Sequence, residues 1–302
     1  MSIMQQQKLR GTGVALITPL RQGKVDFTAL ERVIEHVIAG GVDFVVSLGT
    51  TGEAITLSPA ECREVFDFTI RQVNERVPIV AGLFGNNYTH RLVEGVKNYN
   101  LEGFAAIMSS SPAYNKPPQE GIFQHYMALE KVSPLPIIIY NVPGRTGSNI
   151  EPRTVLRLAQ ASDKFIAVKE ASGDLVQGMQ ILKHRPDNFL VLSGDDPTAL
   201  PLTACGGDGV ISVVANLYPG HWSAMMRAAL NGDQKTAARI NLQLLEVHPW
   251  LYADCNPSGV KAGLEILGLC SKEVRIPLTP QSPENYAGLK AAMDNVPDLI
   301  PV

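Results

Sequence analysis

Eight short apolar runs alternate with amphipathic segments over the first 212 residues of this chain. The runs lie at residues 13–17, 44–48, 78–81, 104–108, 136–140, 165–168, 189–192 and 209–212. Their nearly continuous apolar character is typical of parallel strands that are covered by helices on both faces. The spacing of the runs therefore predicts an α/β fold built from repeated strand and helix units.

The segments between the runs carry the sequence signals of helices. Leu30, Val33, Ile34 and Val37 follow helical spacing,. Residues 58–61, Ser-Pro-Ala-Glu, combine a capping serine, proline at the first helical position and a glutamate that completes a capping box,. Glycines at residues 40 and 41 predict where the first of these helices ends,.

Eight such units favour a closed (β/α)8 TIM barrel, although their number alone also allows an open doubly wound sheet. No GxGxxG motif follows a predicted strand, which removes the main support for a dinucleotide-binding sheet. The glycines at residues 11–13 come before the first strand, and the glycine-rich stretch at residues 206–209 also precedes a strand and is interpreted as a turn rather than a phosphate-binding loop. Helices are expected at residues 224–230, 235–247 and 258–267, so we predict a catalytic barrel over 1–232 and a C-terminal helical region over 233–302.

Composition excludes several classes of partner. A formal net charge of −3 over 302 residues provides no basic surface for nucleic acid or an anionic membrane,. No apolar stretch reaches the ~18 residues of a membrane span, and a cytoplasmic location is expected. The four cysteines form no CxxC pair, so we expect neither a metal site nor a redox cofactor,. They are Cys62, Cys205, Cys255 and Cys270.

Lys169 places an ammonium group inside the apolar run at residues 165–170. An uncompensated buried charge is costly, and burial favours the neutral amine, which attacks carbonyl groups and forms Schiff bases. The ordinary alternative is that Lys169 ends its strand and either reaches solvent or pairs with Glu170.

Polar segments follow several of the predicted strands, at the barrel end where active sites lie. Thr50 and Thr51 form either a plain turn or a site that binds a carboxylate through hydroxyl and backbone N–H groups. Tyr140 is either a core tyrosine or a group that transfers protons to and from a carbinolamine. Tyr114 is compatible with a packing or interface role.

Two further segments carry charge. Arg145 is either solvated or holds a substrate carboxylate through two hydrogen bonds. Adjacent Asp195 and Asp196 project in different directions, so they indicate the start of a helix rather than a glycosidase pair. Taken together, lysine, tyrosine, threonine and arginine at one end of a barrel predict Schiff-base aldol chemistry on a 2-oxo acid.

Five motifs in order along the chain resemble those of the dihydrodipicolinate synthase family, also called 4-hydroxy-tetrahydrodipicolinate synthases. They are GTTGE at 49–53, YNVPGRTG at 140–147, VKEASGD at 168–174, SGDD at 193–196 and GVIS at 209–212. The resemblance extends from about Gly11 to Leu267. Such an ordered series is far more specific than any single motif.

The resemblance implies that Lys169 forms a Schiff base with pyruvate. Tyr140 would relay protons, aided by Thr50 and by Tyr114 of a neighbouring subunit in a homotetramer. Thr51, the backbone at Ile211 and Gly194 would bind pyruvate, and Arg145 would bind the carboxylate of aspartate 4-semialdehyde. The product would be 4-hydroxy-tetrahydrodipicolinate, on the diaminopimelate route to lysine.

Two other functions remain open. N-acetylneuraminate lyases and 2-keto-3-deoxy sugar-acid aldolases resemble this chain, but Arg145 disfavours them because those enzymes generally lack an arginine in this loop. A catalytically silent barrel that binds 2-oxo acids is disfavoured by the intact set of Lys169, Tyr140, Thr50 and Tyr114.

The chain departs from the family members that lysine inhibits. Those relatives carry histidines after the TTGE motif, a tyrosine before the relay tyrosine and a glutamate after the third strand. The corresponding positions here are Pro59 and Cys62, Ala113, and His90. We therefore predict weak or absent inhibition by lysine.

Overall fold

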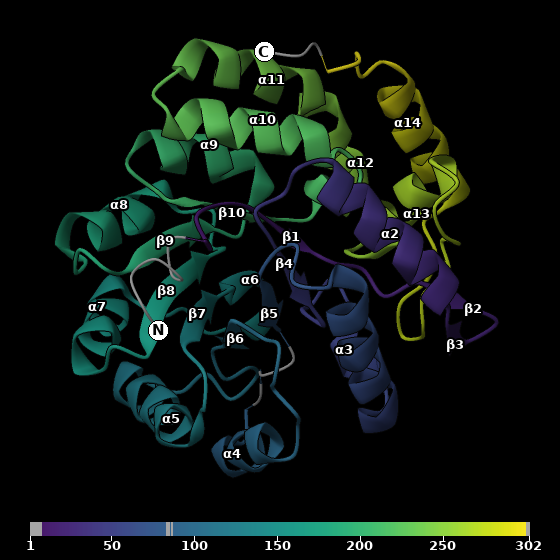
Figure 1. The fold of residues 1–302 in the computed structure, drawn as a ribbon. Helices are drawn as coiled ribbons and strands as arrows, with labels where there is room; N and C mark the ends of the chain where they lie inside the picture. The colour runs from purple at the N-terminus through teal and green to yellow at the C-terminus, as the bar shows by residue number, and fades with distance from the viewer. Residues whose placement is uncertain (1–7, 83–84, 86, 300–302) are drawn as a thin grey trace.

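Eight parallel strands close into a barrel at the centre of the molecule (Figure 1). The structure is a computed structural model that describes residues 8–82, 85 and 87–299. Around the barrel the strands follow chain order, and β1 closes it by pairing with both β4 and β10. The strands are β1 Gly11–Ala15, β4 Phe44–Ser47, β5 Ile79–Ala81, β6 Ala106–Ser110, β7 Ile137–Asn141, β8 Phe165–Glu170, β9 Leu190–Ser193 and β10 Gly209–Ser212. The predicted (β/α)8 barrel is confirmed.

Helices surround the barrel on its outer side, and the four-residue α6 (Pro143–Thr146) lies at its rim. They are α2 Phe27–Ala39, α3 Pro59–Val73, α4 Thr89–Lys97, α5 Gln119–Val132, α6 Pro143–Thr146, α7 Pro152–Ala161, α8 Leu175–His184, α9 Asp196–Ala204 and α10 Pro219–Leu230. The predicted capping box at Ser58 is present at the start of α3, and Gly40 caps the end of α2. Asp195 is the N-cap of α9, which confirms that the two aspartates mark a helix start.

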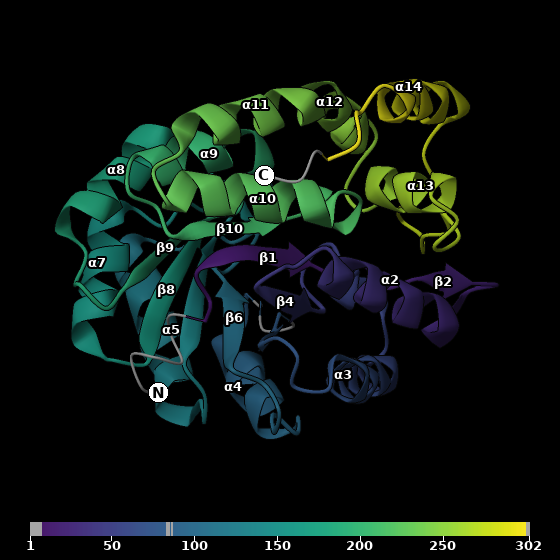
Figure 2. The same cartoon turned by 45° about the horizontal axis from the view of Figure 1, so that its top comes forward.

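Further helices follow the last strand, as predicted. Helices α11 Gln234–Leu244 and α13 Ser258–Ile266 lie where helices were expected, whereas α12 His248–Tyr252 and α14 Pro283–Asp294 were not expected individually. Helix α11 packs on α10, and α13 packs on α14, so these helices form an added layer along one side of the barrel (Figures 1 and 2). Helix α11 also contacts α9 of the barrel, so the C-terminal helices are not separated from the barrel by a gap in contacts. The domain boundary at residue 232 therefore stays a prediction.

The structure differs from the sequence-based expectations at two places near the N-terminus. Strand β1 begins at Gly11 rather than at residue 13, because Gly11 pairs with Gly209 in the register of β1 and β10. A small antiparallel hairpin, β2 Leu20–Arg21 and β3 Lys24–Val25, was not expected. Strands of two residues are too short to produce a periodic sequence pattern.

Apolar side chains fill the barrel and the layer around it. Phe44, Val46, Met108 and Ile138 belong to a cluster inside the barrel, whereas Val45, Ile107 and Ile139 belong to the cluster between strands and helices. This assignment follows the alternation of side chains along each strand. Polar groups therefore collect where the strands end. Within the described parts of the chain, none of the helices has the length and apolar character of a membrane span.

Candidate active site

Lys169 and Tyr140 lie side by side at the carboxyl ends of β8 and β7. The two residues are register partners, and the Lys169 Nζ lies 4.4 Å from the centroid of the Tyr140 ring. Lys169 is 5% exposed and Tyr140 is 7% exposed. A primary amine and a phenol are thus held together within a largely apolar barrel, which suits nucleophilic attack with nearby proton transfer.

The residues that follow these two in the chain form a separate polar network on the other side of the strands. The Glu170 carboxylate accepts hydrogen bonds from Asn141 Nδ2 at 3.0 and 3.2 Å, Gln177 Nε2 at 2.9 Å and the Ser172 backbone N–H at 2.8 Å. Consecutive strand residues face opposite sides, which explains why Glu170 bonds with these groups. The alternative in which Glu170 pairs with Lys169 is wrong. The network instead fastens together the strand ends that carry Tyr140 and Lys169.

Gly194 provides the space that the Lys169 side chain occupies. A Cβ atom at this position would lie 2.7 Å from Lys169 Cε and 2.8 Å from Lys169 Cγ. The Gly194 backbone N–H donates to Glu170 O at 2.7 Å, which holds the segment after β9 against β8. Gly194 was predicted as a substrate-binding residue, and the structure adds this steric reason for a glycine there.

The Thr50–Thr51 segment forms a tight turn after β4. The Glu53 N–H donates to Thr50 O at 3.1 Å, and Glu53 has a left-handed backbone with φ of 55°. Thr51 is buried and its Oγ1 accepts a hydrogen bond from Asn256 Nδ2 at 3.1 Å, whereas Thr50 is exposed. The turn therefore presents one fixed hydroxyl and one accessible hydroxyl.

Ile211 lies on β10, and the turn that follows this strand is held by hydrogen bonds to Asp196. The Asp196 Oδ2 accepts hydrogen bonds from the backbone N–H groups of Val213 and Val214, each at 3.0 Å, and from the Tyr252 hydroxyl at 3.0 Å. Burial, together with the Asp196 carboxylate, raises the pKa of Tyr252, so its hydroxyl stays protonated and donates,. This contact connects α12 to the end of the barrel that carries Lys169.

Arg145 and Tyr114 lie at the rim of the barrel rather than inside it. Arg145 is exposed on α6, and its positive charge partly offsets the rise in the pKa of Tyr252. The Tyr114 side chain is 88% exposed, and its backbone is left-handed with φ of 72°. The Tyr114 N–H donates to Thr146 O at 2.9 Å, so the loop is fastened to α6. At this exposure the phenol is not packed within its own chain.

Sequence reasoning missed Lys261, Glu53 and Asn256. Lys261 on α13 and Glu53 after the Thr50–Thr51 turn form an ion pair that is almost fully buried. Lys261 lies among buried apolar residues of its helix, which is the same signal that singled out Lys169. No local pattern indicates that Asn256 contacts a threonine 205 positions away.

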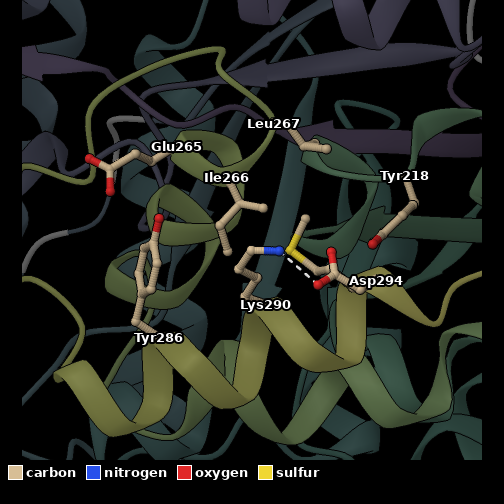
Figure 3. A pocket seen from close by; sticks show the side chains of 8 residues that line it. Tyr218, Glu265, Ile266, Leu267, Tyr286, Lys290 and Asp294 are labelled. Carbon is tan, nitrogen blue, oxygen red and sulfur yellow. Dashed lines mark hydrogen bonds and ion pairs between the residues drawn. The ribbon is translucent and has the colours of Figure 1, made fainter.

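A cavity of about 510 Å³ lies in the C-terminal helical region, between α13 and α14 (Figure 3). Its charged groups already have partners: Lys290 pairs with Asp294 at 2.7 Å, and Lys272 pairs with Glu265 at 3.4 Å. The cavity is lined from α13, α14 and Tyr218 and contains none of the predicted site residues. The end of the barrel around Lys169 remains the better candidate for the active site.

Comparison with known proteins identifies the family. The model of the dihydrodipicolinate synthetase family matches residues 8–296. The chain belongs to the dihydrodipicolinate synthetase family. It is 42% identical over 294 residues to the 4-hydroxy-tetrahydrodipicolinate synthase of Phocaeicola vulgatus, covering 97% of this chain and 99% of that protein. It is 45% identical over 273 residues to the synthase of Flavobacterium psychrophilum, with coverage of 90% and 93%.

Solved structures of this family also match the fold closely. The chloride-inhibited dihydrodipicolinate synthase from Acinetobacter baumannii, complexed with pyruvate, superimposes with a TM-score of 0.92 at 38% identity. The match covers 95% of this chain and 99% of that one. The dihydrodipicolinate synthetase barrel, including its C-terminal helices, is thus shared over nearly the whole chain.

Proposed function

We propose that this chain is a 4-hydroxy-tetrahydrodipicolinate synthase, which condenses pyruvate with aspartate 4-semialdehyde. The observation that carries this proposal is the buried Lys169 Nζ at 4.4 Å from the Tyr140 ring centroid, at the carboxyl end of a barrel of this family. The activity makes the chain a lyase of the class I aldolase type, in the diaminopimelate route to lysine. The proposed chemistry needs no cofactor or metal, because the protonated imine formed by the lysine accepts the electron pair when the pyruvate methyl group loses a proton.

The chemistry begins with the side-chain amine of Lys169. Its nitrogen attacks C2 of pyruvate, and the carbinolamine loses water to give a protonated imine. The hydroxyl of Tyr140, whose ring lies against the Lys169 Nζ, would transfer the protons that this loss of water requires,. Removal of a methyl proton then gives an enamine, whose carbon attacks the aldehyde of the second substrate. The amino group of that substrate attacks the imine carbon, closes the ring and releases Lys169.

The remaining predicted residues are assigned to binding and proton transfer. Thr51 and the backbone at Ile211 would hold the pyruvate carboxylate beside Gly194, and Thr50 would extend the proton relay from Tyr140. Arg145, which is exposed at the rim, would receive the carboxylate of aspartate 4-semialdehyde as it enters,. With these roles, reaction with pyruvate would depend on Lys169, and binding of aspartate 4-semialdehyde would depend on Arg145.

Tyr114 requires a second subunit for its proposed role. Because its side chain is 88% exposed in a single chain, we propose that it completes the proton relay in a neighbouring subunit of a homotetramer. Size measurement in solution and mixing of inactive Tyr114→Phe and Lys169→Met subunits test this arrangement. Partial recovery of activity in the mixture is expected, and no recovery would contradict a shared site.

Reductive trapping tests the proposed function directly. Borohydride added with pyruvate should attach a reduced pyruvyl group to the Lys169 peptide, as measured by mass spectrometry. Lys169→Met should abolish the label, whereas Lys290→Met, which removes an exposed lysine on α14, should not. Condensation with aspartate 4-semialdehyde should greatly exceed cleavage of N-acetylneuraminate. Absence of the label in the unaltered protein would contradict the Schiff-base mechanism.

A further inference from the structure

Asn256 connects the C-terminal helical region to the turn that carries Thr51. It lies between α12 and α13, and its Nδ2 donates a hydrogen bond to Thr51 Oγ1 at 3.1 Å. Asn256 is 8% exposed and Thr51 is 3% exposed, so water competes little for this bond. The contact joins residues 205 positions apart in the sequence at the mouth of the barrel.

This hydrogen bond determines how the Thr51 hydroxyl can be used. A threonine hydroxyl has one hydrogen to donate and two lone pairs that accept. Because Asn256 donates to the oxygen, the Thr51 hydrogen is left to point toward a different acceptor. A carboxylate accepts hydrogen bonds only, so it is matched to a hydroxyl that is fixed in this way.

We propose that Asn256 is a positioning residue that orients the Thr51 hydroxyl as a donor to the carboxylate of the 2-oxo acid substrate. This inference rests on the proposed function, which assigns Thr51 to the pyruvate carboxylate. Asn256 acts through Thr51 and makes no contact with the reacting atoms. Its contribution is to the binding of pyruvate rather than to the bond-forming step.

A separate set of contacts holds the turn and the C-terminal region together. Lys261 pairs with Glu53, which directly follows the Thr50–Thr51 turn, and the Lys261 Nζ also donates to Glu273 O at 2.8 Å. The Arg275 backbone N–H donates to Glu53 Oε2 at 3.2 Å. None of these contacts involves the Asn256 amide. The role of Asn256 in orienting the hydroxyl can therefore be separated from attachment of the region.

Two substitutions separate orientation from packing. Asn256→Ala removes the donor, and we expect the pyruvate KM to rise about fivefold to tenfold, the effect of one hydrogen bond, with kcat changed by less than about twofold. Asn256→Asp presents only acceptors, so it takes the Thr51 hydrogen for itself and also repels the substrate carboxylate. It should raise the pyruvate KM further than alanine does, although it is closer to asparagine in shape.

Gln281→Ala is the matched control. Gln281 is another buried amide of the C-terminal region, and its Nε2 donates to Trp250 O at 2.6 Å rather than to the barrel. Its replacement should leave the pyruvate KM unchanged. The KM for aspartate 4-semialdehyde should be unaffected by either Asn256 substitution.

A double-mutant cycle with Thr51→Val completes the test. Because Asn256 acts through the Thr51 hydroxyl, Asn256→Ala should add almost nothing to Thr51→Val in the pyruvate dependence of borohydride trapping. Unchanged pyruvate dependence in both Asn256 variants, or fully additive effects in the cycle, would overturn the role of Asn256. Failure to trap pyruvate on the unaltered protein would instead overturn the proposed function, so the two failures are distinguishable.

Discussion

The Lys169 Nζ lies 4.4 Å from the centroid of the Tyr140 ring, and the two residues are register partners on adjacent strands. Their relative position is therefore set by backbone pairing rather than by a flexible loop. Sites built on strands are held more precisely than sites built on loops. The pair should respond to a small chemical change at Tyr140 without loss of the fold.

Tyr140→Phe keeps the ring beside Lys169 and removes only the hydroxyl. Because positioned proton transfer contributes roughly 10²- to 10⁴-fold to a rate, we expect kcat to fall by at least about 10²-fold. The pyruvate KM should change much less, since the ring and the lysine keep their positions. Steady-state kinetics at saturating semialdehyde measure both quantities. A kcat close to that of the unaltered protein would exclude Tyr140 as the proton-transfer group.

Arg145→Ala should impair the use of aspartate 4-semialdehyde without affecting the reaction with pyruvate. Loss of a charge-assisted hydrogen bond costs about 1.5–3 kcal/mol, so we expect kcat/KM for aspartate 4-semialdehyde to fall by roughly 10- to 150-fold. Arg145→Lys retains the charge but not the paired geometry and should recover only part of the loss. Trapping of pyruvate on Lys169 should proceed normally in both variants. Unchanged use of the semialdehyde would show that its carboxylate binds elsewhere.

Gly194→Ala should displace the nucleophile. Its new Cβ would lie 2.7 Å from Lys169 Cε and from Ala171 Cβ, so the lysine must leave its position. We expect slow or absent trapping of pyruvate and, from overpacking, a loss of about 1–3 kcal/mol in the free energy of unfolding.

Gly95→Ala is the control for this substitution, because a Cβ there meets nothing within 4 Å. Gly95 lies inside α4, where alanine is the better helix former, so stability should stay equal or rise with full activity,. Trapping at the normal rate in Gly194→Ala would contradict the steric role of Gly194.

Much of this site could be predicted because its signals are local in the sequence. The apolar strand runs, the lysine inside one of them and the capping box at Ser58 each depend on a few neighbouring residues. The apolar run alone left open whether Glu170 pairs with Lys169. Consecutive strand residues face opposite sides, so Glu170 bonds with Asn141 and its neighbours instead,.

Other features could not be predicted from local patterns. The contact between Asn256 and Thr51 joins residues 205 positions apart, and the Glu53–Lys261 pair likewise depends on how the C-terminal helices pack on the barrel. The exposure of Tyr114 also depends on tertiary structure, since aromatic residues in loops are equally suited to cores and interfaces.

Inhibition by lysine should be weak or absent. Cys62 is buried in α3, and its Sγ donates to Ala54 O at 3.9 Å, while burial raises the pKa of its thiol to about 11. A neutral, buried thiol provides no charge for a lysine ligand at the position where the resemblance leads us to expect a histidine in lysine-inhibited relatives. We expect turnover at millimolar lysine to match turnover without it, as measured at subsaturating pyruvate. Strong inhibition would show that other residues form an effector site.

Stability should fall between pH 7 and pH 5 because of His125. This histidine on α5 is buried, and burial lowers its pKa from 6.5 to about 4. Its proton is bound more tightly in the unfolded chain, so the stability that neutral His125 provides is complete above about pH 6.5. That stability is lost as the pH falls toward 4. The loss at pH 5 is about 2 kcal/mol, from roughly 1.4 kcal/mol per pKa unit.

Thermal unfolding of His125→Leu at the two pH values measures this contribution. Leucine cannot be protonated, so the fall in Tm from pH 7 to pH 5 should become smaller than in the unaltered protein. It should not vanish, because burial also lowers the pKa of His248. His90→Leu, at an exposed position on α4, is the control and should keep the original pH dependence. An unchanged fall in Tm in His125→Leu would show that other groups cause the acid sensitivity.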